Sequence, residues 1–224
     1  MTPALRYSNR REAGVFLARH LAHLAGRDDV VVLALPRGGV PVGDEVARAL
    51  QAPLDVFVVR KLGLPGHAEL AMGAIASGGV RVLNEEVVEM CRLSSATIDA
   101  VTRAERGELE RRERAYRDGR PPVPVDGRVV VLVDDGLATG STMKAAVLAV
   151  RSLKPSRIVV AAPVGAADTC RALAETADDV VCPAQPEPFS AVGLWYDDFS
   201  QTSDDEVRQI LAASSPLPRL DRSA

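Results

Sequence analysis

Two adjacent acids and a run of small and hydroxyl-bearing residues follow one apolar segment of the sequence. Residues 129–133 are all aliphatic, which is typical of a buried parallel strand. Asp134 and Asp135 come directly after it, and the periodicity of residues 143–153 predicts a helix beyond the loop. A strand, loop and helix in this order direct backbone N–H groups and a helix N-terminus at one point, which suits a phosphate dianion. The two carboxylates suit hydroxyls or a hydrated divalent cation, so a ligand such as a ribose 5-phosphate would fit both halves.

The whole segment 129–142, VVVLVDDGLATGST, closely resembles the 5-phosphoribosyl-1-pyrophosphate (PRPP) motif of type I phosphoribosyltransferases, in the form typical of adenine phosphoribosyltransferases. The resemblance implies that Asp134 and Asp135 hold the ribose 2- and 3-hydroxyls and bind Mg²⁺. It also implies that the 5-phosphate is bound by Ala138, Thr139, Gly140, Ser141 and Thr142. Hypoxanthine-guanine enzymes carry an Asp at the place of Ala138, so a 6-oxopurine substrate is less expected. The alternative is an acidic strand end followed by an ordinary helix cap.

A glycine-rich turn, residues 36–40, follows an earlier apolar segment. Glycines at a strand end let the backbone approach a ligand, and Arg37 adds a planar cation suited to phosphate oxygens. By resemblance to the family, Arg37, Gly38 and Gly39 bind pyrophosphate. A non-proline cis peptide is common in that loop, and here it would lie between Pro36 and Arg37 or between Arg37 and Gly38. The alternative is a tight turn between strand and helix.

Two cations, Arg60 and Lys61, come at the end of the next predicted strand and could meet pyrophosphate. Residues 62–70 then read as a glycine-bounded loop, which resembles the flexible lid that closes over PRPP in this family. Closure would exclude water from a reactive glycosyl centre. His67 and Glu69 are candidates for contact with the reacting centre, and the alternative is that they are solvated loop residues.

The segment 185–200 holds the only Trp of the chain and half of its four Phe residues. Aromatic residues after the last core strand resemble the hood that stacks on the nucleobase in type I enzymes. Trp195 or Tyr196 could supply an aromatic face worth ~1–3 kcal/mol per stacked base. The alternative is that these residues fasten the C-terminal segment to the core. Glu69 and Asp197 are the candidate proton acceptors, and the general base stays open.

Alternating strands and helices must position these loops. Such alternation predicts an α/β fold of the type I phosphoribosyltransferase kind, with a parallel sheet flanked by helices. Ligands of such sheets lie beyond the carboxyl ends of the strands, where residues 36–41, 60–70 and 134–142 are expected. The strands are predicted at 30–35, 54–59, 72–76, 80–83, 129–133, 158–162 and 180–182.

The chain is expected to form one domain over residues 1–215, followed by a disordered tail at 216–224. An inserted helical arm is predicted at 84–125, and the hood at 185–200. Arginines and acids alternate over residues 103–120. The arm is therefore expected to be exposed, as a solvated or oligomer-contacting helix, and nucleic-acid binding through it is not expected.

Composition limits the remaining classes. The 224 residues are 47% hydrophobic and 25% charged, as in an ordinary globular protein, and the net charge of −3 offers no basic field for nucleic acid or anionic membrane. No apolar run approaches the ~20 residues of a membrane span, and no signal pattern opens the chain. Three cysteines without metal-ligand spacing indicate reduced packing residues and a cytoplasmic protein. A homodimer is compatible with the sequence.

These features predict an enzyme that moves 5-phosphoribose from PRPP to a nitrogenous base, expected to be a nucleobase, and releases pyrophosphate. Such a reaction belongs to nucleotide salvage and uses Mg²⁺. Asp134, Asp135, Arg37 and Lys61 are expected to act in catalysis. The spacing along the whole chain resembles the bacterial group called predicted phosphoribosyltransferases. The alternative is a PRPP-sensing regulatory or binding protein without turnover.

Overall fold

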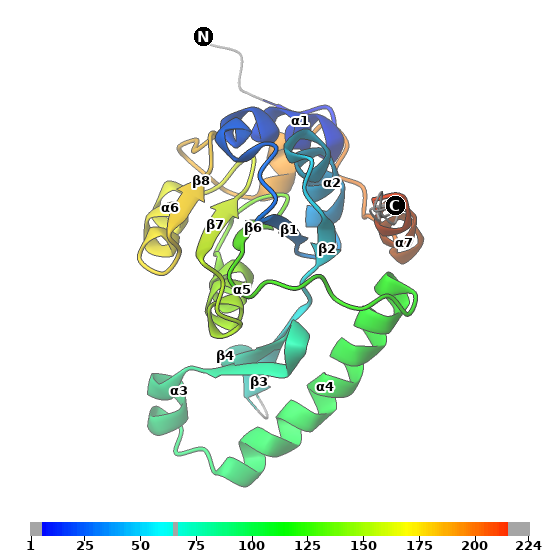
Figure 1. The fold of residues 1–224 in the computed structure, drawn as a ribbon. Coiled ribbons are helices and arrows are strands. Elements are labelled where there is room, and N and C mark those ends of the chain that lie inside the picture. Colours follow the sequence, from blue (N-terminus) through cyan, green and yellow to red (C-terminus); the bar gives the residue numbers. More distant parts are fainter. Residues whose placement is uncertain (1–5, 65–66, 215–224) are drawn as a thin grey trace, which may run out of the picture.

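A five-stranded parallel sheet forms the core of the protein (Figure 1). The computed structural model describes residues 6–64 and 67–214, without the side chains of residues 67–70. The strand order is β2-β1-β6-β7-β8, and all neighbouring pairs run parallel. The α/β fold class is thereby confirmed, whereas the predicted tail at 216–224 lies outside the described residues. The strands are β1 (Val30–Ala34), β2 (Leu54–Val56), β6 (Val129–Val133), β7 (Arg157–Ala161) and β8 (Asp179–Val181).

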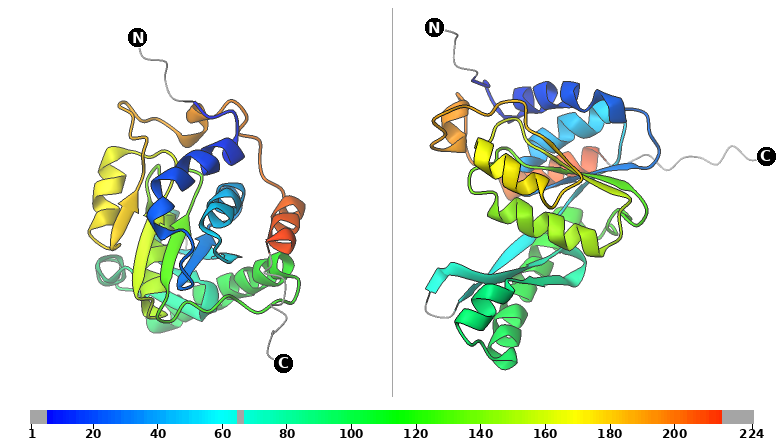
Figure 2. Two further views of the ribbon diagram at one scale, coloured as in Figure 1. Left: turned by 45° about the horizontal axis from the view of Figure 1, so that its top comes forward. Right: turned by 90° about the vertical axis from the view of Figure 1, so that its left-hand side faces the viewer.

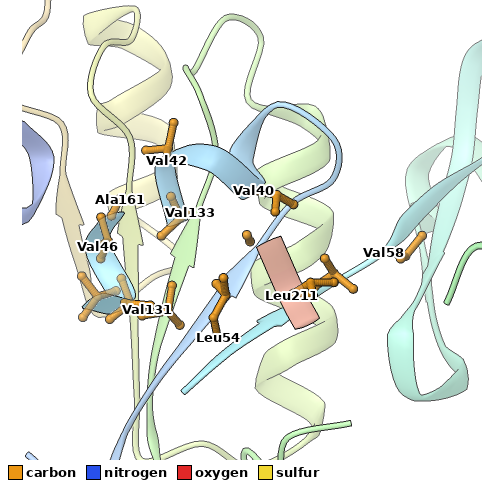
Figure 3. Packing of buried hydrophobic residues seen from close by; sticks show 14 of the residues in the cluster. Val40, Val42, Val46, Leu54, Val58, Val131, Val133, Ala161 and Leu211 are labelled. Carbon is orange, nitrogen blue, oxygen red and sulfur yellow. The ribbon is translucent and has the colours of Figure 1, made fainter. Parts of the chain in front are cut away.

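The two faces of this sheet pack against different helices, because successive side chains of a strand point to opposite sides. On one face, alternate valines of β1 and β6 pack with α1 (Arg10–His20), α2 (Gly39–Leu50) and α7 (Asp204–Ala213), as Figure 3 shows for Val131, Val133 and Leu211. The remaining side chains of the same strands pack with α5 (Ser141–Ser152) and α6 (Ala167–Ala174) on the other face. Figure 2 shows α1 and α2 on one side of the sheet and α5 on the opposite side.

The chain changes face between β1 and β6. β1 leads into α2, whereas β6 leads into α5 across the sheet. The two strands are direct neighbours, with Ala34 paired to Val133 at their carboxyl ends. Diverging connections from neighbouring parallel strands open a crevice, which is where ligands of such folds bind. The glycine-rich turn and the acidic loop predicted from the sequence both leave the sheet at this point.

A second, antiparallel sheet lies below the first in Figure 1 and consists of β3 (Val59–Leu64), β4 (His67–Ala76) and β5 (Val80–Leu83). The prediction of a loop over 62–70 was therefore wrong, since most of it belongs to the β3–β4 hairpin. Irregular pairing around Gly63, where the register shifts on both sides, hides the alternation of a strand from sequence reading. The predicted strand at 54–59 is correspondingly divided between β2 and β3.

The inserted arm consists of α3 (Glu85–Met90) and α4 (Ser95–Arg117), each capped by the side chain that precedes it. It is less exposed than expected, because α4 packs against β3, β4 and α7 along one side. Arg117 at its end is buried and donates to both carboxylate oxygens of Asp55, at 2.9 and 3.1 Å. Among the described residues, no helix is long and apolar enough to cross a bilayer. The described part of the chain also contains three short 3₁₀ turns: η1 (Ala22–Leu24), η2 (Ser77–Gly79) and η3 (Val192–Trp195).

Candidate active site

Asp134 and Asp135 form a half-buried carboxylate pair at the end of β6. Asp134 Oδ1 accepts a hydrogen bond from the backbone N–H of Asp135 at 2.9 Å. Burial, and then the charge of Asp135, raise the pKa of Asp134 well above its ordinary value. Burial also raises the pKa of Asp135, and the hydrogen bond from Arg10 opposes that rise. The pair is therefore short of positive charge, which suits a ligand with hydroxyl donors or a cation.

The phosphate loop, residues 138–142, ends at the N-terminus of α5. Gly140 is the N-cap, with a φ of 69° that favours glycine, and no described side chain caps the helix. Thr169 Oγ1 holds the loop by donating to the carbonyl oxygen of Ala138 at 2.5 Å. The hydroxyls of Thr139 and Ser141 lie 3.3 Å apart on the exposed side. Open N–H groups and two hydroxyls at a helix N-terminus make a suitable site for a phosphate dianion.

The glycine loop, residues 36–39, passes directly over the carboxylate pair. The peptide bond between Pro36 and Arg37 is cis, at one of the two predicted places. A Cβ on Gly38 would lie 2.0 Å from Asp135 Oδ2, and one on Gly39 would lie 2.7 Å from the carbonyl oxygen of Val133. Only glycine allows such an approach. Among the described residues, the backbone N–H groups of Arg37 and Gly38 make no hydrogen bond, so both are open to an anionic ligand.

Known proteins show similarity over most of this chain. The phosphoribosyl transferase domain family matches residues 10–196. The chain belongs to this family. Two curated relatives are 53% identical to it over 90% of the chain. They are "Putative phosphoribosyl transferase MT0597" of Mycobacterium tuberculosis strain CDC 1551 / Oshkosh and "Putative phosphoribosyl transferase Rv0571c" of strain ATCC 25618 / H37Rv. The alignment covers 45% of each, so this chain spans about half the length of these relatives. The crystal structure of TT1426 from Thermus thermophilus is 43% identical, with a TM-score of 0.85, and the match covers 94% of this chain and 99% of that one.

The predicted cations of this phosphoribosyl transferase domain lie in different surroundings. Arg37 forms an ion pair of 3.5 Å with Asp204 at the start of α7. Arg60 is held by Glu105 of α4, at 2.8 Å from Nε. Lys61 is next to Arg60 in β3, so its side chain points to the other side of the strand. It is exposed and lines a cavity of about 490 Å³ together with Ser141 and Lys144.

The hood, residues 185–200, closes over the acidic loop. Tyr196 donates its hydroxyl to the carbonyl oxygen of Asp135 at 2.6 Å, and a Cβ on Gly136 would lie 2.4 Å from Val192 Cγ1. Trp195 stacks on Phe189, with ring centroids 6.5 Å apart and an interplanar angle of 9°. Trp195 Nε1 is buried and has no partner among the described residues. These contacts fasten the segment to the core, as the alternative has it, whereas stacking of Trp195 or Tyr196 on a base stays a prediction.

Sequence reasoning missed Arg10, the first residue of α1. Its Nε donates to Asp135 Oδ2 at 2.7 Å. Arg10 follows the N-cap Asn9 and looks like an ordinary first-turn residue, and 125 positions separate it from Asp135. Nothing in the local sequence could have revealed that contact. The side chains of His67 and Glu69 lie outside the described residues, so their predicted roles stay predictions.

Proposed function

We propose that the protein transfers 5-phosphoribose from PRPP to a nitrogenous base, with release of pyrophosphate. One observation carries this proposal: the carboxylate pair, the glycine loop and the N-terminus of α5 converge on the crevice between β1 and β6. That arrangement has hydrogen-bond acceptors in the middle and N–H donors on both sides. PRPP has the complementary order, with a diol between a phosphate and a pyrophosphate.

The ribose end of PRPP is assigned to the acidic and phosphate loops. Asp134 and Asp135 accept hydrogen bonds from the 2- and 3-hydroxyls, and residues 138–142 bind the 5-phosphate. Two points of attachment fix the sugar ring and hence the direction of C1. Fixing C1 relative to an incoming base lowers the barrier, because the orientation is imposed by binding.

The pyrophosphate end is assigned to the glycine loop and to Lys61. The open N–H groups of Arg37 and Gly38 face the charge that develops on the leaving group. Lys61 makes no ion pair among the described residues, so its ammonium is available from the β3–β4 hairpin. Closure of that hairpin over bound PRPP would exclude water from C1.

The donor set fits Mg²⁺. The pair supplies hard carboxylate oxygens, and Mg²⁺ in proteins is commonly held by one or two carboxylates together with substrate phosphates and water. Among the described residues, no group of three or more His, Cys, Asp or Glu side chains could hold a metal ion. Asp134 and Asp135 would hold Mg²⁺, and when bound it would offset the charge of the departing pyrophosphate.

We assign the acceptor to the hood and expect a nucleobase. The assignment is supported by the aromatic residues of this segment, among them Trp195 and Phe189, whose rings are stacked on each other. The base would approach C1 from the side opposite to pyrophosphate. The nitrogen of the acceptor would attack C1 as the C1–O bond to pyrophosphate breaks, and the proton lost by that nitrogen would pass to the released pyrophosphate or to water.

PRPP binding without turnover is the second candidate. The ion pairs of Arg37 with Asp204 and of Arg60 with Glu105 favour it, since both arginines are engaged outside the pyrophosphate site. A regulator needs only the carboxylate pair and the phosphate loop. An enzyme also needs the cations at the leaving group.

Pyrophosphate release tests the proposal. The purified protein is incubated with Mg²⁺, PRPP and one base at a time from a purine and pyrimidine panel, beside the Asp135→Asn variant. We expect one base to support release in the unmodified protein and not in the variant, while the variant still binds PRPP weakly. PRPP binding with no release from any base would favour the regulator.

A further inference from the structure

The guanidinium of Arg10 lies where the acidic loop and the hood meet. Nε donates to Asp135 Oδ2 at 2.7 Å, and Nη1 donates to the carbonyl oxygen of Ser200 at 2.6 Å. Arg10 Cζ lies 4.0 Å from the centroid of the Phe199 ring and 5.9 Å from that of Tyr196. Only 11% of the Arg10 side chain is exposed. One largely shielded cation thus contacts the carboxylate of Asp135 and three residues of the hood.

The same guanidinium also reaches the glycine loop. A Cβ on Gly38 would lie 3.3 Å from Arg10 Nε and 2.0 Å from Asp135 Oδ2. Gly38, Asp135 and Arg10 therefore lie close together, with no room for a side chain at Gly38. A displacement of the Asp135 carboxylate cannot occur without a response from Arg10, because interiors packed at this density transmit small shifts.

We propose that Arg10 is a positioning residue that couples occupation of the carboxylate pair to the hood. This inference rests on the proposed function, since it takes the ribose diol of PRPP as the group that reaches Asp135. Asp135 Oδ2 already accepts the charge-assisted bond from Arg10. An arriving diol hydroxyl or hydrated cation must share that oxygen, and Arg10 adjusts. Ser200 and Phe199 follow Arg10, because one is bonded to it and the other is stacked on it.

Such coupling would matter for a transferase, because PRPP bound at Asp135 would then change the hood to which the acceptor base is assigned. Linkage makes the effect reciprocal, so an acceptor bound in the hood would tighten PRPP. Without Arg10, the two subsites would bind their ligands independently.

Trp195 is the only tryptophan of the chain and lies in η3 of the hood, so its fluorescence reports on that segment alone. The experiment titrates Mg²⁺ and PRPP into the unmodified protein, Arg10→Gln and Arg10→Lys, following Trp195 emission and, in parallel, heat of binding. Arg6→Gln is the matched control, because Arg6 donates to the carbonyl oxygen of Tyr196 in the hood at 3.1 Å and forms no bond to Asp134 or Asp135.

In the unmodified protein we expect Trp195 emission to change with the same dissociation constant as the heat. In Arg10→Gln we expect PRPP to bind about tenfold or more weakly, as loss of a hydrogen bond to a charged group implies, with no change in emission. Arg10→Lys keeps the positive charge but lacks the planar guanidinium. It should therefore restore much of the affinity for PRPP and less of the change in Trp195 emission. Arg6→Gln should retain both.

An emission change that persists in Arg10→Gln, or that is absent in the unmodified protein while PRPP binds, would overturn the coupling and leave the proposed function standing. Failure of the unmodified protein to bind PRPP would overturn both. Thermal melting of each variant shows whether it is folded, and Arg10→Lys carries the test if Arg10→Gln is not.

Discussion

Replacing Gly38 with alanine should damage the site without damaging the fold. The new methyl carbon would lie 2.0 Å from Asp135 Oδ2, whereas ordinary contact begins at 3.4 Å, so the carboxylate must retreat by about 1.4 Å. The loop is held in place by the hydrogen bond that the Gly39 N–H donates to the carbonyl oxygen of Leu35 at 3.0 Å, so we expect the side chain of Asp135 to move instead. Such a retreat breaks the 2.7 Å bond from Arg10 and misplaces the carboxylate that we propose as the acceptor of the ribose hydroxyls.

The size of the effect follows from the bonds that are lost. A hydrogen bond to a charged group is worth about 1.5–3 kcal/mol, which corresponds to roughly 10- to 150-fold in affinity. Isothermal titration of Gly38→Ala with Mg²⁺ and PRPP should show a loss within that range. Gly107→Ala is the matched control, because its methyl group in α4 meets no atom within 4 Å and should leave PRPP affinity unchanged. If Gly38→Ala bound PRPP within twofold of the unmodified protein, Asp135 would not be the acceptor of the diol.

Three other predictions follow from the same structure. Lys61→Gln should lower kcat for pyrophosphate release and leave the melting temperature unchanged, because Lys61 is exposed; an unchanged kcat would exclude it from catalysis. Arg117→Ala should lower the free energy of unfolding in urea by about 3–5 kcal/mol, since it leaves the carboxylate of Asp55 buried without its cation. Arg114→Ala is the control and should cost under about 0.5 kcal/mol, because the ion pair of Arg114 with Glu110, at 3.7 Å, is exposed. Burial raises the pKa of Tyr116 to about 12 in the folded protein, so as the pH rises the unfolded chain loses this proton first and the free energy of unfolding falls from pH 10 towards 12. In urea titrations over that range, Tyr116→Phe should show a shallower fall in the free energy of unfolding. An equal fall in the variant would contradict the prediction.

The parts of the fold that the sequence could predict are those with continuous local signals. Five aliphatic residues in a row mark β6, and Asp134 and Asp135 mark its carboxyl end. The start of the predicted arm at residue 84 is visible because the side chain of Asn84 caps the helix that follows. Parallel strands bring such ends together, so the glycine loop and the acidic loop could be placed in one crevice from the sequence alone.

The parts that could not be predicted depend on contacts distant in the sequence. Arg10 and Arg60 are engaged by acids 125 and 45 positions away, and no local pattern encodes which acid an arginine will meet. The β3–β4 hairpin could not be predicted for a different reason. The irregular pairing around Gly63 interrupts the alternation of side chains by which a strand is recognised in a sequence. The buried side of α4 was hidden by its many charges, although Ile98, Leu109 and Tyr116 are buried along it.

The most direct test of the central claim is the binding of PRPP to the unmodified protein and to the double variant Asp134→Asn/Asp135→Asn, measured by isothermal titration with and without Mg²⁺. The substitutions keep the shape of both side chains and remove their charge. We predict Mg²⁺-dependent binding by the unmodified protein and its loss in the double variant. Equal binding by both proteins, or no binding by either, would contradict the assignment of this crevice as a PRPP site.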